Sequence, residues 1–469
     1  MEKLRGMNER VKKLRQVSES TTPHIYMERA VLMTEAYKKY EGSVSVPELR
    51  ALSMKEVFSR KTISIGDGEL IVGDKGAGPQ STPTFPELCC HTLEDMHVMN
   101  DRDLICFKVD DDAVEIQKNV IIPFWEKRST RHRILENMTE EWKKCYGAGI
   151  FTEFMEQRGP GHTVGSEKIY EKGFLDYQHD IDEALTKLDF LNDEDAYAKS
   201  EELKGMRIMC DAIMILGRRY ADLAREMAAE EKDEGRRGEL LEIARNCDVV
   251  PAHKPQTYWQ AIQMYWFAHL GVTTELNPWD AYSPGRLDQH LFPFYERDME
   301  SGTLSRDKAL ELLECLWVKF NNQPAPPKVG ITLKESSTYT DFANINTGGI
   351  TPDGQNGVNE VSYLILDCMD EMKLLQPSSN VQISKKTPRK FLKRACEISP
   401  RGGDSLLFII PRLSFRSLWM MASLLRMLAV AARAVVSRRA RSDVRRIFCR
   451  GILIFPRFSS LPCLMVMTM

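Results

Sequence analysis

Three short segments of the sequence combine glycine, proline, histidine, acidic and aromatic residues in ways that packing alone does not require. In the first, Phe151–Val164, a Gly-Pro-Gly run predicts a turn that presents His162 from a loop. A histidine presented in this way can take part in catalysis, although loop histidines more often only satisfy local hydrogen bonds. His162 is therefore a candidate site residue, and the structural alternative stays open.

In the second segment, Asn277–Asp298, an aspartate lies between two aromatic residues. Asp280 follows Trp279 and precedes Tyr282, and a Ser-Pro-Gly turn comes next. A carboxylate held half-buried among aromatic rings has a shifted pKa, and such carboxylates are frequent in active sites. The other interpretation of Asp280 is a helix cap or a surface residue.

The third segment is a hydroxyl-rich loop, Ser336–Phe342, inside the polar stretch Lys334–Thr347. Its hydroxyl groups could hold a small polar substrate, or the loop could simply be solvated. A long polar loop inside a compact domain is usually functional or disordered, and here we favour a function. None of the three segments matches a catalytic triad, a P-loop, a Rossmann fingerprint or a metal motif.

The one cluster of possible metal ligands is Cys89-Cys90-His91. We interpret it as buried structure and expect no metal, because no second ligand pair follows at metal spacing. Eleven cysteines without a C-x-x-C pair are typical of reduced thiols in a cytoplasmic protein. The basic N-terminus lacks an apolar stretch, and no run of 18 apolar residues occurs through Arg401, so we expect neither a secretion signal nor a membrane span.

The elements that must position these segments are mainly helices. A length of 469 residues, 43% of them apolar, is enough to bury a large core. His253–Leu270 is apolar on nearly every face, which predicts a buried helix. Apolar spacing or start signals predict further helices at Ile25–Tyr40, Pro47–Val57, Asp182–Leu188, Lys199–Glu231 and Gly238–Cys247.

Strand signals are fewer. Thr62–Val72 predicts a hairpin around the turn at Gly66-Asp67-Gly68. Beyond Asn321 the chain is rich in proline and glycine, with short strand candidates at Val329–Leu333 and Asn380–Ser384. The residues alone therefore indicate an enzyme-like α/β protein with a polar pocket.

Longer runs carry a resemblance to a known family. Ser283–Asp298 (SPGRLDQHLFPFYERD) is similar to the glycyl radical enzymes of the pyruvate formate-lyase superfamily, as are Ile63–Gly73 and Phe342–Gly349. The likeness runs from about Arg10 to Gly402. Within the superfamily the chain most resembles the hydroxyproline dehydratases, through near-verbatim runs at Glu28–Ser43 and Asn321–Ile350.

The resemblance implies an α/β fold, in which ten strands in two half-barrels are wrapped by helices. Residues 1–402 would form the N-terminal half of this domain, so the barrel is expected to be incomplete here. In such enzymes a radical-SAM activating enzyme places a radical on a backbone glycine, which oxidises a cysteine in a G-C-V-E loop. The thiyl radical then abstracts hydrogen, and 4-hydroxyproline loses water to give a pyrroline carboxylate. The full-length family is expected to form homodimers.

The resemblance also implies a set of pocket residues. We expect His162 and Asp280 to contact the ring nitrogen and the hydroxyl of the substrate, and Ser336 to contact its carboxylate. Phe154 and Phe342 would lie against the ring faces. The thiyl cysteine would fall at position 436, where this sequence has Val436.

After Gly402 the resemblance is expected to stop. Residues 403–469 contain eleven arginines, no lysine and two acidic residues, whereas residues 1–402 contain 53 basic and 65 acidic residues. Shifting the reading frame by one nucleotide at codon 402 lets Gly403–Arg412 be re-read as WGQPSFYNTE and Ala431–Ala440 as GGTSGCVETG. We therefore interpret 403–469 as an out-of-frame tail, not a native domain, and expect this chain to be inactive.

The sequence leaves two alternative functions. One is another glycyl radical enzyme, such as a formate acetyltransferase, a glycerol or diol dehydratase, or a different carbon–oxygen or carbon–carbon lyase. The other is a non-catalytic protein whose basic tail binds nucleic acid or an acidic membrane. The tail has no lysine and no ordered amphipathic pattern, so we expect neither partner.

Overall fold

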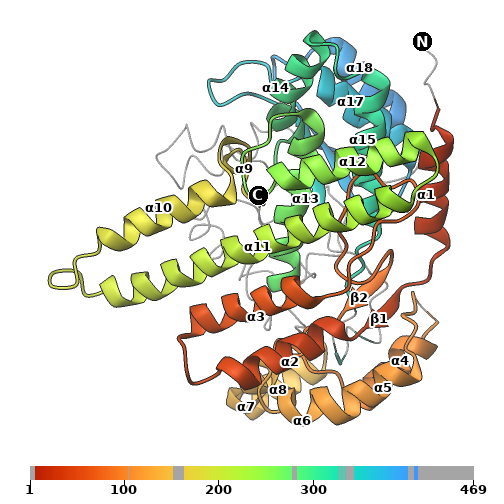
Figure 1. Ribbon diagram of the computed structural model, residues 1–469. Coiled ribbons are helices and arrows are strands. Elements are labelled where there is room, and N and C mark those ends of the chain that lie inside the picture. Colours follow the sequence, from red (N-terminus) through yellow and green to blue (C-terminus); the bar gives the residue numbers. More distant parts are fainter. Residues whose placement is uncertain are drawn as a thin grey trace.

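The computed structural model describes residues 6–103, 105–150, 163–276, 282–326, 329–330, 333, 343–399 and 406–409. Helices dominate the described chain (Figure 1). Their bounds are α1 Glu9–Ser20, α2 Glu28–Tyr40, α3 Val46–Arg60, α4 Leu93–Asp101, α5 Asp111–Ile116, the π-helix η1 Gln117–Ile121, α6 Ile122–Trp125, α7 Thr130–Asn137, α8 Glu140–Gly147, α9 Lys168–Glu171, α10 Phe174–Thr186, α11 Ala196–Glu230, α12 Glu234–Val249, α13 Tyr258–Glu275, α14 Leu287–Glu300, α15 Arg306–Asn321, α17 Glu360–Met372 and α18 Arg389–Ile398.

The described strands are short and parallel. β1 (His24–Tyr26) pairs with β2 (Ser81–Pro83). β4 (Ser378–Gln382) lies between β3 (Asn344–Gly348) and β5 (Leu406–Ile409). Single parallel bridges join Gly285 to Ile345 and Thr163 to Ser283, which extends this sheet on the β3 side. Five extended positions, near residues 163, 283, 344, 378 and 406, therefore lie in series.

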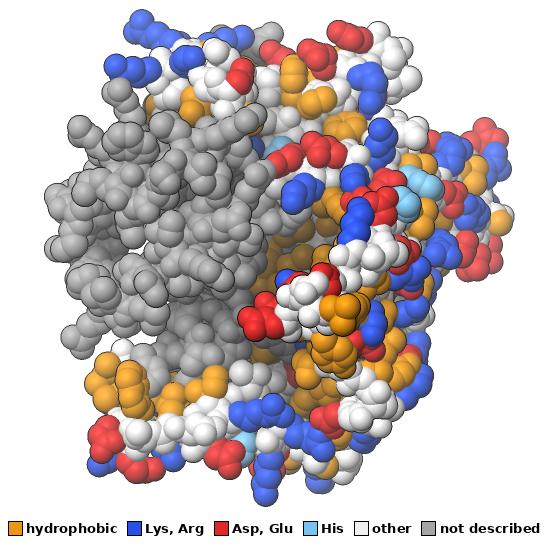
Figure 2. Space-filling model, turned by 90° about the vertical axis from the view of Figure 1, so that its left-hand side faces the viewer, with side chains coloured by type: hydrophobic (Ala, Val, Ile, Leu, Met, Phe, Trp, Pro, Cys, Tyr) orange, Lys and Arg blue, Asp and Glu red, His pale blue; other side chains and the backbone are white. Residues whose placement is uncertain are grey.

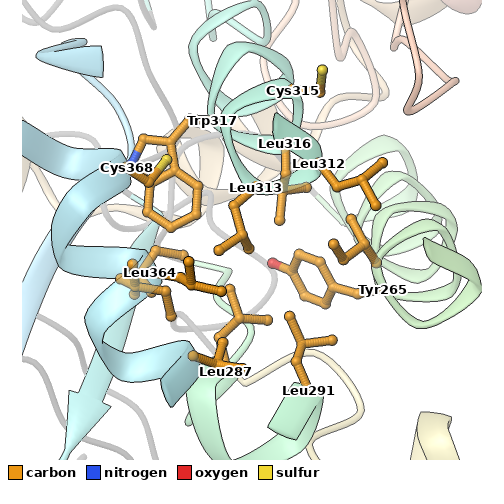
Figure 3. Packing of buried hydrophobic residues seen from close by; sticks show 14 of the residues in the cluster. Tyr265, Leu287, Leu291, Leu312, Leu313, Cys315, Leu316, Trp317, Leu364 and Cys368 are labelled. Carbon is orange, nitrogen blue, oxygen red and sulfur yellow. The ribbon is translucent and has the colours of Figure 1, made fainter. Parts of the chain in front are cut away.

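A large apolar core lies where α13, α14, α15 and α17 meet. Trp317 and Leu313 of α15 pack in one cluster with Tyr265 of α13, Leu291 of α14 and Leu364 of α17 (Figure 3). All five side chains are buried. Helix α13 is buried along most of its length, which confirms the prediction made from its apolar residues on every face.

Most other helix predictions are confirmed with small shifts of their ends. The long predicted helix is α11, with 35 residues, and it packs with α3, α10 and α12. Together α10 and α11 form a helical hairpin that projects to the left in Figure 1. The stretch predicted to start a helix at Ile25 instead begins as β1, and the one predicted from Asp182 is the end of α10.

Two strand predictions are wrong. The segment 62–72 keeps its turn, where Glu69 accepts a hydrogen bond from the backbone N–H of Gly66 (2.8 Å), but no hairpin forms. Val329–Leu333 is not a strand at its described residues, and Gly330 has a φ of 69°, which a strand does not allow. The prediction at Asn380–Ser384 is confirmed as β4, whereas β3 was missed because its residues read as a polar loop.

Side chains of α13 explain why the hairpin is absent. The amide of Gln263 accepts from the backbone N–H of Val72 and donates to its carbonyl, both at 2.9 Å. The indole N–H groups of Trp259 and Trp266 donate to the carbonyls of Leu70 (3.0 Å) and Gly73 (2.8 Å). These side chains take the backbone groups that a second strand would otherwise have paired.

Positive and negative side chains are interspersed over the described surface in Figure 2 rather than gathered by sign. In the described part of the chain, no helix is both long enough and apolar enough to cross a membrane. Among the same residues, no group of three or more histidine, cysteine or acidic side chains is arranged to hold a metal ion.

Candidate functional site

All five predicted pocket residues lie outside the described residues: Phe154, His162, Asp280, Ser336 and Phe342. Val436 lies outside them as well. The described chain resumes within the first two predicted segments, at Thr163 and Tyr282, and directly after the third, at Ala343. The geometry at these points shows how the segments are held relative to one another.

The three segments meet at Ser283, which is fully buried. Its carbonyl oxygen accepts a hydrogen bond from the backbone N–H of Val164 (2.9 Å). Its side-chain oxygen accepts one from the backbone N–H of Asn344 (2.8 Å). One serine thus joins the chain just after His162 to the chain just after Phe342, through both its main chain and its side chain.

The Ser-Pro-Gly turn continues this junction toward β3. Gly285 has a φ of 75°, in the left-handed region that favours glycine, and its carbonyl accepts from the N–H of Asn346 (3.3 Å). Helix α14 begins at Leu287, directly after the turn. The turn therefore positions both the strand pairing and the start of a buried helix.

Asp288 fixes that helix to the end of β3. One of its carboxylate oxygens accepts from the backbone N–H of Gly348 (2.6 Å) and from the hydroxyl of Ser362 (2.5 Å) on α17. The other oxygen accepts from the backbone N–H of Gln289 (2.9 Å). Burial raises the pKa of Asp288 to about 6, against the opposing effect of these hydrogen bonds. Sequence reasoning missed this residue, although an acidic residue in the first turn of a helix is a recognisable signal.

His290 lies two residues further along α14. Burial lowers its pKa to about 4, and its ring lies 5.5 Å from that of Tyr170 of α9, centroid to centroid. A histidine of lowered pKa and a carboxylate of raised pKa therefore lie near the start of the same helix. Both side chains help to hold the three segments together, because Asp288 bonds to β3 and α17 and His290 packs against α9.

A cavity of about 370 Å³ lies beside the junction, between α9, α10, α11 and α13. Its lining is almost entirely apolar and includes Val164, Phe174, Ile213, Val272 and Leu276. Few polar groups are available there to bind a small charged molecule. The cavity therefore does not have the polar lining that the sequence predicts for the substrate pocket.

Comparison with known proteins places this arrangement in a family. A family model described as pyruvate formate lyase-like matches residues 7–418. The chain belongs to the pyruvate formate lyase-like family. Among curated relatives of this family, trans-4-hydroxy-L-proline dehydratase of Clostridioides difficile is 70% identical over 398 residues, which cover 85% of this chain and 50% of the relative.

Solved structures of the pyruvate formate lyase-like family agree. Hydroxyproline dehydratase of Clostridioides difficile, with trans-4-hydroxy-L-proline bound, matches with a TM-score of 0.88 at 65% identity, over 92% of this chain and 54% of that one. The B12-independent glycerol dehydratase of Clostridium butyricum matches with a TM-score of 0.83 at 29% identity, over 92% and 54%. The fold is thus that of glycyl radical enzymes, and the chain spans about half the length of these relatives.

The match to the family model continues beyond Gly402, the residue after which we expect the resemblance to stop. The family model extends to residue 418, and β5 pairs with β4 at 406–409. Residues 410–469 lie outside the described chain. The out-of-frame origin of 403–469 stays a prediction.

Proposed function

We propose that this chain carries the substrate-binding half of a glycyl radical dehydratase that removes water from trans-4-hydroxy-L-proline to give a pyrroline carboxylate. The observation that carries the proposal is the 70% identity over 398 residues to trans-4-hydroxy-L-proline dehydratase. The five strand positions in series would then be one half of the ten-stranded barrel. We propose further that the full-length protein is a cytoplasmic homodimer and that a radical-SAM enzyme activates it.

The pocket follows from the three segments that meet at Ser283. His162 and Asp280 would contact the ring nitrogen and the hydroxyl group, and Ser336 would contact the carboxylate. Phe154 and Phe342 would cover the faces of the ring. The hydrogen bonds of Ser283 to Val164 and Asn344 support this set, because they hold the flanking chain of three segments together.

The radical step needs groups that this sequence does not have at the matching positions. In the family, a backbone glycyl radical installed by an activating enzyme supplies hydrogen abstraction through a thiyl cysteine. Here position 436 is Val436 and position 438 is Arg438, where the family's motif has cysteine and glutamate. The chain would therefore bind the substrate without converting it.

Binding can be tested directly by isothermal titration calorimetry. We expect trans-4-hydroxy-L-proline to bind at least about tenfold more tightly than L-proline. L-Proline has no hydroxyl group, so it leaves the buried polar groups that would contact the hydroxyl without a hydrogen-bond partner. His162→Ala and Asp280→Asn should each weaken binding at least about tenfold. The matched controls His179→Ala and Asp222→Asn alter exposed residues and should leave it unchanged. Equal binding of both ligands would contradict the proposal.

Turnover requires a second experiment. The 469-residue chain, incubated anaerobically with an activating enzyme and hydroxyproline, should give no pyrroline carboxylate. A gene with one nucleotide restored near codon 402, and the downstream sequence intact, should give both product and a glycyl radical signal in electron paramagnetic resonance. Turnover by the unrepaired chain would overturn the predicted inactivity.

The alternative is a different substrate within the family. The similarity to glycerol dehydratase at a TM-score of 0.83 keeps glycerol as the competing ligand. A radical signal without turnover of hydroxyproline, together with turnover of glycerol, would move the assignment to that substrate.

A further inference from the structure

The proposed function does not account for the apolar cavity between α9, α10, α11 and α13. Its volume is about 370 Å³, and thirteen described residues line it. For comparison, an engineered apolar cavity of about 150 Å³ stays dry and binds benzene. The cavity in this chain therefore has room for a molecule with two or three rings.

The space arises where α11 crosses α13. Gly271 of α13 lies against Ile213 of α11, since a Cβ atom at position 271 would come within 2.8 Å of the Cδ1 atom of Ile213. From this crossing α11 continues into the projecting hairpin with α10 (Figure 1). Ala268, a small residue, lines the cavity on α13, and Met209 lines it on α11. The two helices thus pack closely near Gly271 and diverge beyond it, which leaves a gap that their side chains do not fill.

The polar groups around the cavity already have partners or lie in solvent. Tyr177 lines the cavity, and its hydroxyl donates to the backbone carbonyl of Lys168 (2.8 Å). Glu275 forms an ion pair with Arg50 of α3. The side chain of Lys168 is exposed. A charged or strongly polar molecule would therefore lose its hydration in the cavity and gain few hydrogen bonds in return.

The cavity also adjoins the junction at Ser283. Val164 lines it and donates its backbone N–H to the carbonyl of Ser283 (2.9 Å). A molecule in the cavity would pack against Val164 and bind best when this hydrogen bond is formed. Binding to one conformation stabilises that conformation by mass action.

We propose that this cavity is a binding site for a small uncharged molecule made of two or three apolar rings. Its volume sets the size of the occupant, and its lining sets the chemistry. Hydroxyproline, which carries an amine, a carboxylate and a hydroxyl group, does not match this lining. Filling of the cavity stabilises the contact between Val164 and Ser283.

The probe is N-phenyl-1-naphthylamine, an uncharged molecule whose fluorescence rises in apolar surroundings. Its emission should rise and saturate when it is titrated with the 469-residue chain. Val272→Trp and Met209→Trp fill the cavity from opposite walls, and each should weaken binding at least about tenfold. The control variants Val46→Trp and Met206→Trp add the same ring at exposed positions and should bind like the parent. If a tryptophan variant fails to fold, phenylalanine at the same position takes its place.

Three further measurements complete the test. The probe should raise the melting temperature of the parent and not that of the filled variants. Hydrogen exchange at the Val164 amide should slow when the probe is bound. An excess of trans-4-hydroxy-L-proline should not displace the probe. Absence of saturable binding, equal binding to the filled variants, unchanged exchange at Val164, or displacement by hydroxyproline would each overturn the proposal.

Discussion

At the scale of single residues, the three segments that meet at Ser283 are held together by side chains that accept hydrogen bonds from backbone N–H groups. Ser283 joins two segments that are far apart in the sequence, and Asp288 holds the N–H of Gly348 at the end of β3. Both side chains are fully buried, so water cannot replace them if they are removed. Each can therefore be tested by substitutions that change only a few atoms.

Ser283→Ala should destabilise the chain and weaken its binding to trans-4-hydroxy-L-proline. The variant leaves the buried N–H of Asn344 without its acceptor, which costs about 1–3 kcal/mol. Urea unfolding measures the stability and calorimetry the binding. Ser43→Ala, at an exposed serine, is the matched control and should match the parent in both.

Asp288→Asn should change how stability depends on pH. Because burial raises the pKa of Asp288 to about 6, the folded state holds its proton more tightly than the unfolded state does. This contribution is present below pH 4 and is lost as the pH rises to 6, by up to about 3 kcal/mol. The variant should therefore gain stability relative to the parent between pH 4 and 6, in urea unfolding measured at each pH. A constant difference would contradict the raised pKa.

His290→Gln should show the opposite trend. Burial lowers the pKa of His290 to about 4, so the unfolded state binds its proton more tightly. The parent loses this stability as the pH falls from 6.5 to 4, and the variant does not. The variant should thus gain on the parent toward low pH, which separates its effect from that of Asp288.

At the scale of elements, the spacing of apolar residues in the sequence predicted the helices, whose formation depends mainly on residues nearby in the chain. Helix α13 was predicted because its own residues are apolar on nearly every face, and α11 because apolar residues recur at helical spacing along it. β3 could not be predicted, because its Asn and Thr side chains carry no apolar alternation. The hairpin prediction failed because Gln263 and two tryptophans of α13, nearly 200 residues away, bind its backbone. The position of Ser283 between two other segments likewise had no local signal.

Gln263→Leu should remove the side chain that pairs with the backbone of Val72 in place of a second strand. It leaves the buried N–H and C=O of Val72 unpaired at once, which predicts a loss of about 2–5 kcal/mol. Thermal and urea unfolding measure the effect. Gln256→Leu, at an exposed glutamine just before α13, should change stability by less than about 0.5 kcal/mol. Similar stability of the two variants would show that the paired amide is not needed.

At the scale of the whole molecule, the family determines the arrangement of the elements. The resemblance predicted a strand barrel wrapped by helices, which neither composition nor periodicity could indicate. The TM-score of 0.88 to hydroxyproline dehydratase confirms the fold type of glycyl radical enzymes, while the ten-stranded barrel stays a prediction. The pocket residues themselves stay a prediction, because all five lie outside the described chain. The order of the five strand positions follows from pairings over long sequence separations.

A chain that ends after Ile409 should behave like the full 469 residues. If 410–469 is out of frame, its arginines reflect codon phase, and its removal should change neither the melting temperature nor the binding of trans-4-hydroxy-L-proline. Differential scanning fluorimetry and calorimetry test both. A clear drop in melting temperature would show that this stretch stabilises the fold.

The pairing of Thr163 with Ser283 has a consequence for synthesis on the ribosome. The two residues are about 120 positions apart, so at roughly 5–20 residues per second the first waits about 6–24 seconds for its partner to be made. Helices α10, α11 and α12 lie between them and can form during this interval, because their contacts are local. The pairing of Thr163 with Ser283 must therefore form after these helices can already have formed. Until then the backbone groups at Thr163 lack their partner strand and can pair with another chain, so a chaperone that shields this segment should raise the yield.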